Sequence, residues 1–451
     1  DEVLACFEAE RAILTRVSPA LPVTTNFMGF FKPMDYWRWA AREDIVSHDS
    51  YPDPSDPEST ARAAMSGDLM RSLGGGRPWV LMEQAPSQVN WRAQNALKRP
   101  GQMRLWSMQA VARGADGVMF FQWRQSRAGA EKFHSAAVPH GPAHSSPTWR
   151  EVVQLGGELR ELDAVCGSRV RADVAILLDW ESWWALELPS KPSNRIQQIE
   201  QLEAYYRPLF EANVTTDFAR PTDDLSRYKL VIAPSMYLVS DAAAANVAAY
   251  VEGGGNLLMS FFSGIVDSND HIRLGGYPQP FLRVLGMQVL DWLPLGDGEV
   301  LPVRFGDGGE GYGVVWSELI EAQGAEVLAT FAASSLSGRP ALTLNRFGAG
   351  SAQYIGTHLD PAALGRWVKS AWTRAGVKPV SEAPVGVEVV RRTMANGSLL
   401  FLLNHGDAPV EIAISGDAVY LNGGNTVASG RVHLEPRDVA ILHQSEVRSQ
   451  A

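Results

Sequence analysis

The sequence is poor in cysteine and has no long apolar run. Its 451 residues include two cysteines, Cys6 and Cys166, which lie far apart and provide neither a metal-binding cluster nor a disulfide framework. This usage predicts a reducing compartment and hence a cytoplasmic protein. No stretch reaches the roughly 20 consecutive apolar residues that a membrane helix needs, so no membrane partner is expected.

Positive charge is also in deficit. The chain has 40 Lys and Arg residues against 50 Asp and Glu residues, which gives a formal net charge of −10. That balance disfavours nucleic acids and anionic membranes as partners and suits a neutral substrate. Hydrophobic residues make up 45% and charged residues 20%, an ordinary composition for globular proteins. The length predicts two to four domains.

The first residues lack an initiator methionine and the basic region of a signal peptide. Val3, Leu4, Phe7, Ile13 and Leu14 recur instead at helical spacing and predict an amphipathic helix. Because the chain opens inside an element, we expect it to be part of a longer protein.

Strands and helices alternate through the first third of the chain. This order predicts a parallel sheet of three strands. In chain order, the expected elements after the opening helix are strand 21–28, helix 57–73, strand 78–84, helix 100–113, strand 117–123 and helix 147–164.

The stretch from Pro78 to Gln84 is an apolar run that closes on one carboxylate, Glu83. Such a run predicts a buried parallel strand whose carboxyl end presents a functional group. In a barrel of alternating strands and helices, catalysis takes place at that end. A surface glutamate just past a strand is the alternative.

Aromatic and polar residues follow all three strands, among them Asn26, Tyr36, Trp91 and Gln122. Aromatic rings stack on the apolar face of a sugar, while amides and acids bond its hydroxyl groups, so the pattern favours a sugar site. Core packing is the alternative. We expect it for Phe27, Trp106 and Phe120, and expect it less for the residues in loops that contain Pro, Gly or Asn, namely Tyr36, Trp37, Trp39 and Trp91.

Glu131 and His134 lie three positions apart in a polar loop and would share a face of a helical turn. We favour hydrogen bonds to substrate hydroxyls over a metal site, because the chain offers no further His/Cys cluster. A solvated surface pair is the other possibility. No metal or cofactor is predicted.

Three stretches together resemble glycoside hydrolase family 42 β-galactosidases. They are Val23-Thr24-Thr25-Asn26-Phe27-Met28-Gly29, Leu81-Met82-Glu83-Gln84-Ala85-Pro86 with Asn90-Trp91, and Phe120-Phe121-Gln122-Trp123-Arg124-Gln125-Ser126-Arg127 with Glu131-Lys132-Phe133-His134. The resemblance covers the whole chain. It implies a TIM (β/α)8 barrel, an α/β trimerisation domain, a small β domain, a homotrimer, and cleavage of terminal β-D-galactosides with retention of configuration.

By this resemblance Glu83 is the nucleophile. The residues expected to bind galactose are Trp91, Phe121, Glu131, His134, Asn26 and Tyr36. The family's acid/base glutamate stands in an Asn-Glu pair, and no such dipeptide occurs in this sequence. The three strands resemble the sixth to eighth of the barrel, so we expect a C-terminal part that lacks the first five strands and is inactive alone. Glu131 is a conceivable substitute acid.

The predicted domains are a partial barrel at 1–165, a flavodoxin-like α/β trimerisation domain at 170–380 and a small antiparallel β-sandwich-like domain at 385–446. Cys166 precedes the first strand of the middle domain, which excludes an amidotransferase nucleophile. By the resemblance, the aromatic run at 179–184 would form the trimer interface or the roof of the active-site cleft, and local core packing is an equal alternative. The last residues are expected to be disordered.

The leading interpretation is thus a retaining β-galactosidase without its acid/base group. One alternative is an α-L-arabinopyranosidase or another barrel glycosidase. The other is a galactoside-binding protein or trimer scaffold without catalysis.

Overall fold

The computed structural model describes residues 1–414, 418–421, 427 and 430–445. The chain forms two compact units. The first comprises Asp1–Arg171, Phe210–Asn213 and Pro379–Ala451, and the second comprises Ala172–Leu209 and Val214–Lys378.

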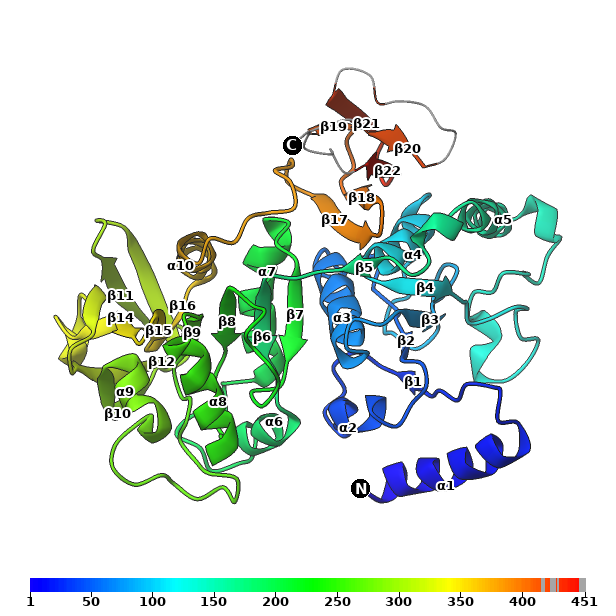
Figure 1. Cartoon of the computed structure of the whole chain (residues 1–451). Helices are drawn as coiled ribbons and strands as arrows, with labels where there is room; N and C mark the ends of the chain where they lie inside the picture. Colours follow the sequence, from blue (N-terminus) through cyan, green and yellow to red (C-terminus); the bar gives the residue numbers. More distant parts are fainter. Residues whose placement is uncertain (415–417, 422–426, 428–429, 446–451) are drawn as a thin grey trace. The chain divides into compact units, whose positions relative to one another are not determined.

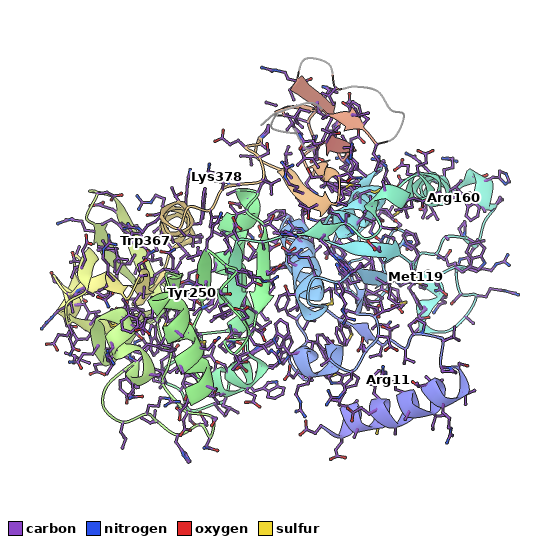
Figure 2. All side chains as sticks on the ribbon, viewed as in Figure 1. Arg11, Met119, Arg160, Tyr250, Trp367 and Lys378 are labelled. Carbon is purple, nitrogen blue, oxygen red and sulfur yellow. The ribbon has the colours of Figure 1, made fainter. Side chains whose placement is uncertain are left out.

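The first unit begins with a parallel sheet flanked by helices (Figure 1). Its strands pair in sequence order, β1-β2-β3-β4. In chain order the elements are α1 (Glu2–Val17), β1 (Asn26–Phe27), α2 (Tyr36–Ala40), β2 (Ser47–Asp49), α3 (Ser59–Leu73), β3 (Trp79–Glu83), α4 (Gln102–Ala112), β4 (Ala115–Val118) and α5 (Pro147–Arg160). Met119, which follows β4, is half exposed (Figure 2).

The prediction of three strands is wrong by one, because it missed β2. That strand has only Ile45 and Val46 as an apolar signal, and the following Ser47 and His48 are polar but buried. A strand that buries polar side chains lacks the alternation by which strands are recognised. The assignment to the sixth to eighth barrel positions allowed for three strands and therefore does not account for the fourth, β2.

A small β domain completes the first unit. Its larger sheet has the order β20-β22-β18-β17-β5, and a separate pair is β19-β21. The bounds are β5 (Arg169–Val170), β17 (Val387–Met394), β18 (Gly397–Asn404), β19 (Val410–Ala413), β20 (Val419–Tyr420), β21 (Arg431–Leu434) and β22 (Val439–Ser445). Two core clusters use opposite faces of the larger sheet: one contains Phe401 and residues of α4 and α5, and the other contains Leu402 and residues of β19 and β21. The small antiparallel β domain predicted for this region is confirmed. The predicted disorder of the last residues, 446–451, falls outside the described residues.

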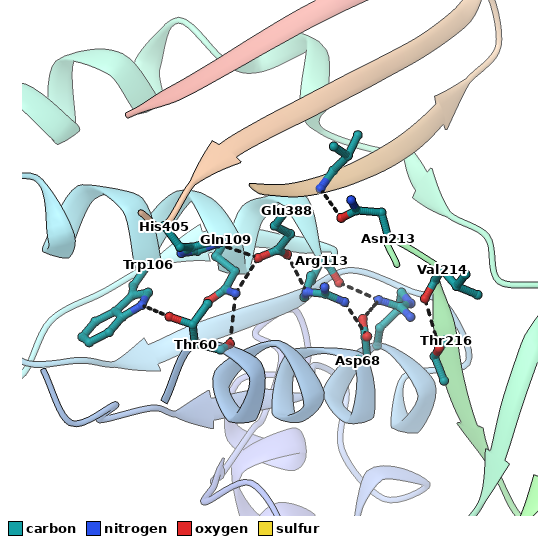
Figure 3. A network of polar contacts seen from close by, with 12 residues as sticks. Thr60, Asp68, Trp106, Gln109, Arg113, Asn213, Val214, Thr216, Glu388 and His405 are labelled. Carbon is teal, nitrogen blue, oxygen red and sulfur yellow. Dashed lines mark hydrogen bonds and ion pairs between the residues drawn. The ribbon is translucent and has the colours of Figure 1, made fainter. Parts of the chain in front are cut away.

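Buried charges join this β domain to helix α4 (Figure 3). The Glu388 carboxylate is 2% exposed and accepts hydrogen bonds from Arg113 Nε at 2.8 Å and Gln109 Nε2 at 2.7 Å. His405 Nε2 lies 2.8 Å from the same carboxylate. Burial alone would raise the pKa of Glu388, but the Arg113 charge and then His405 outweigh it, so the pKa is lowered.

Arg392 makes a second buried connection. Its guanidinium is fully buried and donates to the carbonyl oxygen of Val111 at 2.6 Å, to Ser168 Oγ at 2.8 Å and to Asp116 Oδ1 at 2.8 Å. Arg392 therefore connects strand β17 to helix α4, to strand β4 and to the segment before β5.

The second unit is built on a mixed sheet. Its parallel strands have the order β7-β6-β8-β9-β15, which is the flavodoxin order 2-1-3-4-5. The parallel elements are β6 (Val174–Leu177), α6 (Trp180–Leu186), α7 (Gln198–Glu211), β7 (Thr216–Ala219), β8 (Leu230–Ala233), α8 (Asp241–Glu252), β9 (Asn256–Ser260), β15 (Gly350–Ile355) and α10 (Pro361–Arg374). The predicted flavodoxin-like order is confirmed. Tyr250 of α8 and Trp367 of α10 are buried in this unit (Figure 2).

An antiparallel extension of the same sheet lies between β9 and β15 in the sequence. This extension is an addition to the predicted β-α-β series. Its elements are α9 (Leu282–Leu285), β10 (Met287–Pro294), β11 (Val300–Phe305), β12 (Glu310–Ala322), β13 (Glu326–Phe331), β14 (Pro340–Phe347) and, after β15, β16 (Thr357–Leu359). The described part of the chain also contains short 3-10 helices: η1 (Ala130–Phe133), η2 (Ala143–Ser145), η3 (Asp163–Val165), η4 (Gln279–Phe281) and η5 (Ser334–Leu336).

The aromatic run at 179–184 forms helix α6. Asp179 caps the helix by accepting from Glu181 N at 2.9 Å, and Trp180 and Trp183 are 1% and 3% exposed. Local core packing is therefore the correct alternative for these two side chains. Cys6 and Cys166 are both free and exposed.

We predict that Glu388→Ala destabilises the first unit by about 3–5 kcal/mol, because it leaves an excess of buried positive charge at Arg113. Urea unfolding followed by tryptophan fluorescence measures the change. The matched control is Arg99→Ala, which removes a more exposed ion pair between Arg99 and Asp407 (2.7 Å) that also joins the β domain to the segment before α4. It should cost at most about 1 kcal/mol. Equal losses for the two variants would contradict the prediction.

Candidate functional site

The candidate site lies at the carboxyl edge of the four-stranded sheet. Glu83 is the last residue of β3 and pairs in register with Asp49, the last residue of β2. Ser50 N donates to the Glu83 carbonyl oxygen at 2.8 Å and continues this pairing past the strand ends. Asn26 belongs to β1, so three neighbouring strands bring an amide and two carboxylates together.

Each oxygen of the Glu83 carboxylate has a donor. Tyr51 OH donates to Oε2 at 2.6 Å, and Asn26 Nδ2 donates to Oε1 at 3.4 Å. Asn26 Nδ2 also donates to Asp49 Oδ2 at 2.9 Å. One amide thus bridges the two carboxylates, and the Glu83 carboxylate is held in a single orientation.

The electrostatics of this cluster follow from burial and from like charges. Burial raises the pKa of Asp49 to about 6; the Asn26 hydrogen bond lowers it, and the negative charge of Glu83 raises it. Burial, the hydrogen bond to Glu83 and the surrounding acids raise the pKa of Tyr51 well above its usual value. Tyr51 therefore remains a hydrogen-bond donor throughout the physiological pH range.

Aromatic rings surround Tyr51, whose hydroxyl group donates to Glu83. The Trp91 ring is 56% exposed, and its centroid lies 4.9 Å from that of Tyr51 and 5.4 Å from that of His134. Phe121 meets the His134 ring edge-on at 5.2 Å. An exposed indole beside carboxylates and amides offers both the apolar and the polar contacts that a sugar ring needs.

Hydrogen bonds join the loop after β3 to the loop that contains η1. Asn90 Nδ2 donates to the Ala130 carbonyl oxygen at 2.7 Å, and Ser135 N donates to the Gln88 carbonyl oxygen at 3.0 Å. These bonds bring the η1 loop, with exposed Glu131 and fully buried His134, to the side of β3. The negative charge of Glu131 contributes to the raised pKa of Tyr51.

Several polar atoms around this cluster are buried without a protein partner. In the part of the chain that the structure describes, they are Asp49 Oδ1, Asn90 Oδ1, Gln122 Nε2 and His134 Nε2. Buried polar groups are normally paired, so a group of unpaired atoms calls for an explanation such as a bound ligand or water. No three His, Cys, Asp or Glu side chains among the described residues are arranged to hold a metal ion.

Tyr36 is not at the surface of the site. It is 1% exposed in α2, stacks on Phe27 at 3.9 Å and accepts a hydrogen bond from Met28 N at 3.0 Å. The expectation that core packing was less favoured for Tyr36 and Trp39 is therefore wrong. Asp35 caps α2 by accepting from Trp37 N at 2.9 Å, and this helix turns both rings into the core. Phe27 and Trp106 are buried as predicted, while Phe120 is only partly buried.

Asp49 and Tyr51 were missed because strand β2 was missed. The available signal was Asp49-Ser50-Tyr51-Pro52, a carboxylate and an aromatic residue that follow a short β-branched run. The same pattern had drawn attention to Glu83 and Trp91.

A further buried carboxyl, Glu43, lies before β2 and so belongs to the amino ends of the strands. It is 6% exposed and accepts a hydrogen bond from Thr24 Oγ1 at 3.5 Å. Burial raises the pKa of Glu43 to about 8, although hydrogen bonds from Thr25 and Thr24 oppose the shift. The neighbouring Asp44 is exposed, and hydrogen bonds from Val23 N and Arg11 lower its pKa.

Comparison with known proteins gives a consistent result. Residues 1–162 match the family model described as Beta-galactosidase, residues 172–378 match Beta-galactosidase trimerisation domain, and residues 386–444 match Beta-galactosidase C-terminal domain. Among the described residues, no helix is long and apolar enough to cross a membrane.

Curated relatives include Beta-galactosidase bgaB of Geobacillus kaustophilus, 46% identical over 448 residues, and Beta-galactosidase LacZ of Heyndrickxia coagulans, 47% identical over 446 residues. Each alignment covers 99% of this chain but 66% of the relative. The chain thus spans about two thirds of the length of these relatives.

Solved structures agree. The β-galactosidase from Bacillus circulans sp. alkalophilus superposes with a TM-score of 0.95 at 40% identity, over 99% of this chain and 66% of that one. The β-galactosidase from Rahnella sp. R3 superposes with a TM-score of 0.93 at 35% identity, over 99% of this chain and 67% of that one.

We predict opposite pH effects for two adjacent carboxyl variants. The folded-state pKa of Glu43 is raised, so wild-type stability is lost as pH rises from about 4.5 through about 8. Glu43→Gln removes that loss and should raise the melting temperature more at pH 9 than at pH 5. Asp44 has a lowered pKa, so Asp44→Asn should destabilise the protein at neutral pH. Melting temperatures measured from pH 5 to pH 9 test both statements. If both variants raised the melting temperature, or both lowered it, the assigned pKa shifts would be contradicted.

Proposed function

Because the chain belongs to the glycoside hydrolase family 42 β-galactosidases, we propose that it carries the nucleophile of a retaining β-galactosidase site, Glu83. One observation supports this role above others. Glu83 ends a barrel strand, Tyr51 and Asn26 hold its carboxylate through separate oxygens, and the Tyr51 ring contacts an exposed tryptophan, Trp91. The substrate is a terminal non-reducing β-D-galactoside.

In the first step, Glu83 attacks the anomeric carbon, the bond to the leaving oxygen breaks, and a galactosyl ester of Glu83 forms. A second carboxylic acid gives its proton to the leaving oxygen. In the second step, that carboxylate takes a proton from water, the water oxygen attacks the anomeric carbon, and Glu83 is released. Two inversions at one carbon give net retention.

The residues of the site divide into two sets. Tyr51 and Asn26 orient the nucleophile, and their bonds to the carboxylate must weaken as its charge passes to the ester. Trp91, Phe121, Glu131, His134 and Asp49 form the galactose subsite. Tyr36 is buried and accepts a hydrogen bond from Met28 N, so we assign it a structural role and no contact with the sugar.

The acid/base group is the element that this chain lacks. No Asn-Glu dipeptide occurs in its sequence. Asp49 and Glu83 share the Asn26 amide, but Asp49 lies directly next to Glu83 on the adjacent strand. We therefore do not assign Asp49 as the acid/base group. The chain by itself therefore has little or no hydrolytic activity toward ordinary galactosides.

The same proposal assigns residues 1–165 to the partial barrel, 170–380 to a trimerisation domain and 385–446 to the small β domain. The match of residues 172–378 to the trimerisation model supports a homotrimer.

The nucleophile can be tested without an acid catalyst. The reagent 2,4-dinitrophenyl 2-deoxy-2-fluoro-β-D-galactoside releases a weakly basic phenolate that needs no proton, while its fluorine slows hydrolysis of the ester. We predict that this chain becomes covalently labelled and that peptide mass spectrometry places the label on Glu83. The variant Glu83→Gln should remain unlabelled. A label on any other carboxylate, or none at all, would refute the assignment.

Trp91 is predicted to contribute stacking of about 0.5–1.5 kcal/mol to sugar binding, so Trp91→Ala should weaken galactose binding roughly 2- to 12-fold. Because the side chain is 56% exposed, the variant should keep the stability of the wild type. Titration calorimetry measures both affinities. The control is Trp123→Ala, which removes a 70% exposed ring that packs on Trp149 instead of on the site. A similar loss in the two variants would argue against a specific contact.

A further inference from the structure

Lys98 contacts the two residues that follow the candidate nucleophile in the chain. It lies in the loop between β3 and α4, and its ammonium is 5.4 Å from the centroid of the Trp106 ring. Burial lowers the pKa of Lys98 to about 7; the charge of Glu151 opposes this shift and that of Arg92 adds to it. The side chain is partly buried, and its ammonium has lost part of its hydration there.

The ammonium contacts the two residues that follow Glu83. Nζ donates to Gln84 Oε1 at 3.3 Å and to the carbonyl oxygen of Ala85. These contacts reach both the side chain and the backbone of the strand end. Lys98 therefore restrains the direction in which the chain leaves β3.

The Gln84 side chain is itself held at both ends. It is 1% exposed, and its Nε2 donates to Ser107 Oγ at 2.6 Å, while Ser107 Oγ donates to the Met103 carbonyl oxygen at 2.7 Å. The amide can therefore offer only its oxygen to Lys98. The backbone of Gln84 is fixed as well, since its carbonyl oxygen accepts from Phe121 N at 3.1 Å.

Glu83 thus stands between two restraints. On one side, Ser50 N holds its carbonyl oxygen, and on the other, Lys98 and Ser107 hold the next residue. Its carboxylate must keep both Tyr51 and Asn26 as partners, at 2.6 and 3.4 Å. A displacement of roughly 1 Å at a reacting group can cost on the order of a hundredfold in rate.

We propose that Lys98 is a positioning residue for Glu83. Through Gln84 and Ala85 it holds the end of β3 so that the Glu83 carboxylate faces the anomeric carbon. It touches neither substrate nor reacting atoms. This inference rests on the proposed nucleophilic role of Glu83.

The test uses Lys98→Met, which keeps an unbranched side chain of similar shape and removes the ammonium with its contacts to Gln84, Ala85 and the Trp106 ring. The probe is again 2,4-dinitrophenyl 2-deoxy-2-fluoro-β-D-galactoside, and the rate of labelling at saturating reagent is measured separately from the affinity for galactose. We expect the labelling rate to fall at least 10-fold and the galactose affinity to stay within 2-fold. The matched control is Lys132→Met, an exposed lysine of the η1 loop, which should leave the rate unchanged.

A second variant covers the case in which Lys98→Met fails to fold. Ser107→Ala removes the acceptor that orients Gln84 and should lower the labelling rate by a smaller factor, about 3-fold, again with unchanged galactose affinity. The inference is overturned if Lys98→Met is labelled at the wild-type rate. If Lys98→Met does not fold, a wild-type labelling rate in Ser107→Ala overturns it instead. An equal loss of labelling rate and galactose affinity overturns it as well. Absence of label on wild-type Glu83 overturns the proposed function and this inference together.

Discussion

The buried contact between Glu388 and Arg113 is the constraint on which the first unit depends. It fixes the C-terminal β domain to helix α4, although the two lie 275 positions apart in the chain. Helix α4 also carries Ser107, which orients Gln84, the residue after Glu83. The orientation of the candidate nucleophile is therefore connected, through one helix, to a β domain that has no chemical groups of its own in the site.

The groups of the candidate site lower the free energy of unfolding of the first unit. Two carboxylates share a single amide donor, and the negative charge of Glu83 helps to raise the pKa of Asp49 to about 6. Unpaired buried atoms such as Asp49 Oδ1 and His134 Nε2 add to this cost. Such groups are kept where binding or catalysis needs them, and the surrounding structure must compensate. Ordinary core packing offers that compensation on the helix side of the sheet, where Trp79 and Met103 are almost completely buried.

The second unit has a flavodoxin-like strand order and a core rich in aromatic side chains. Flavodoxin-like sheets bind ligands beyond the carboxyl ends of their strands. Here Phe261 and Phe262 follow β9 directly, are 1% and 2% exposed, and pack with Trp316 in one cluster. These aromatic side chains extend the core of the unit beyond the carboxyl end of β9.

The sequence alone determined the alternation of elements, the position of Glu83 and the family resemblance, since apolar runs and their polar ends are local properties of a chain. Only the tertiary structure decided which residues surround Glu83. Strand β2 buries Ser47 and His48, so its sequence does not look like a strand, and Asp49 and Tyr51 stayed hidden with it. Tyr36 looked like a loop residue until helix α2 turned it onto Phe27. Burial and pairing depend on what the rest of the chain brings to a residue, and no local pattern contains that information.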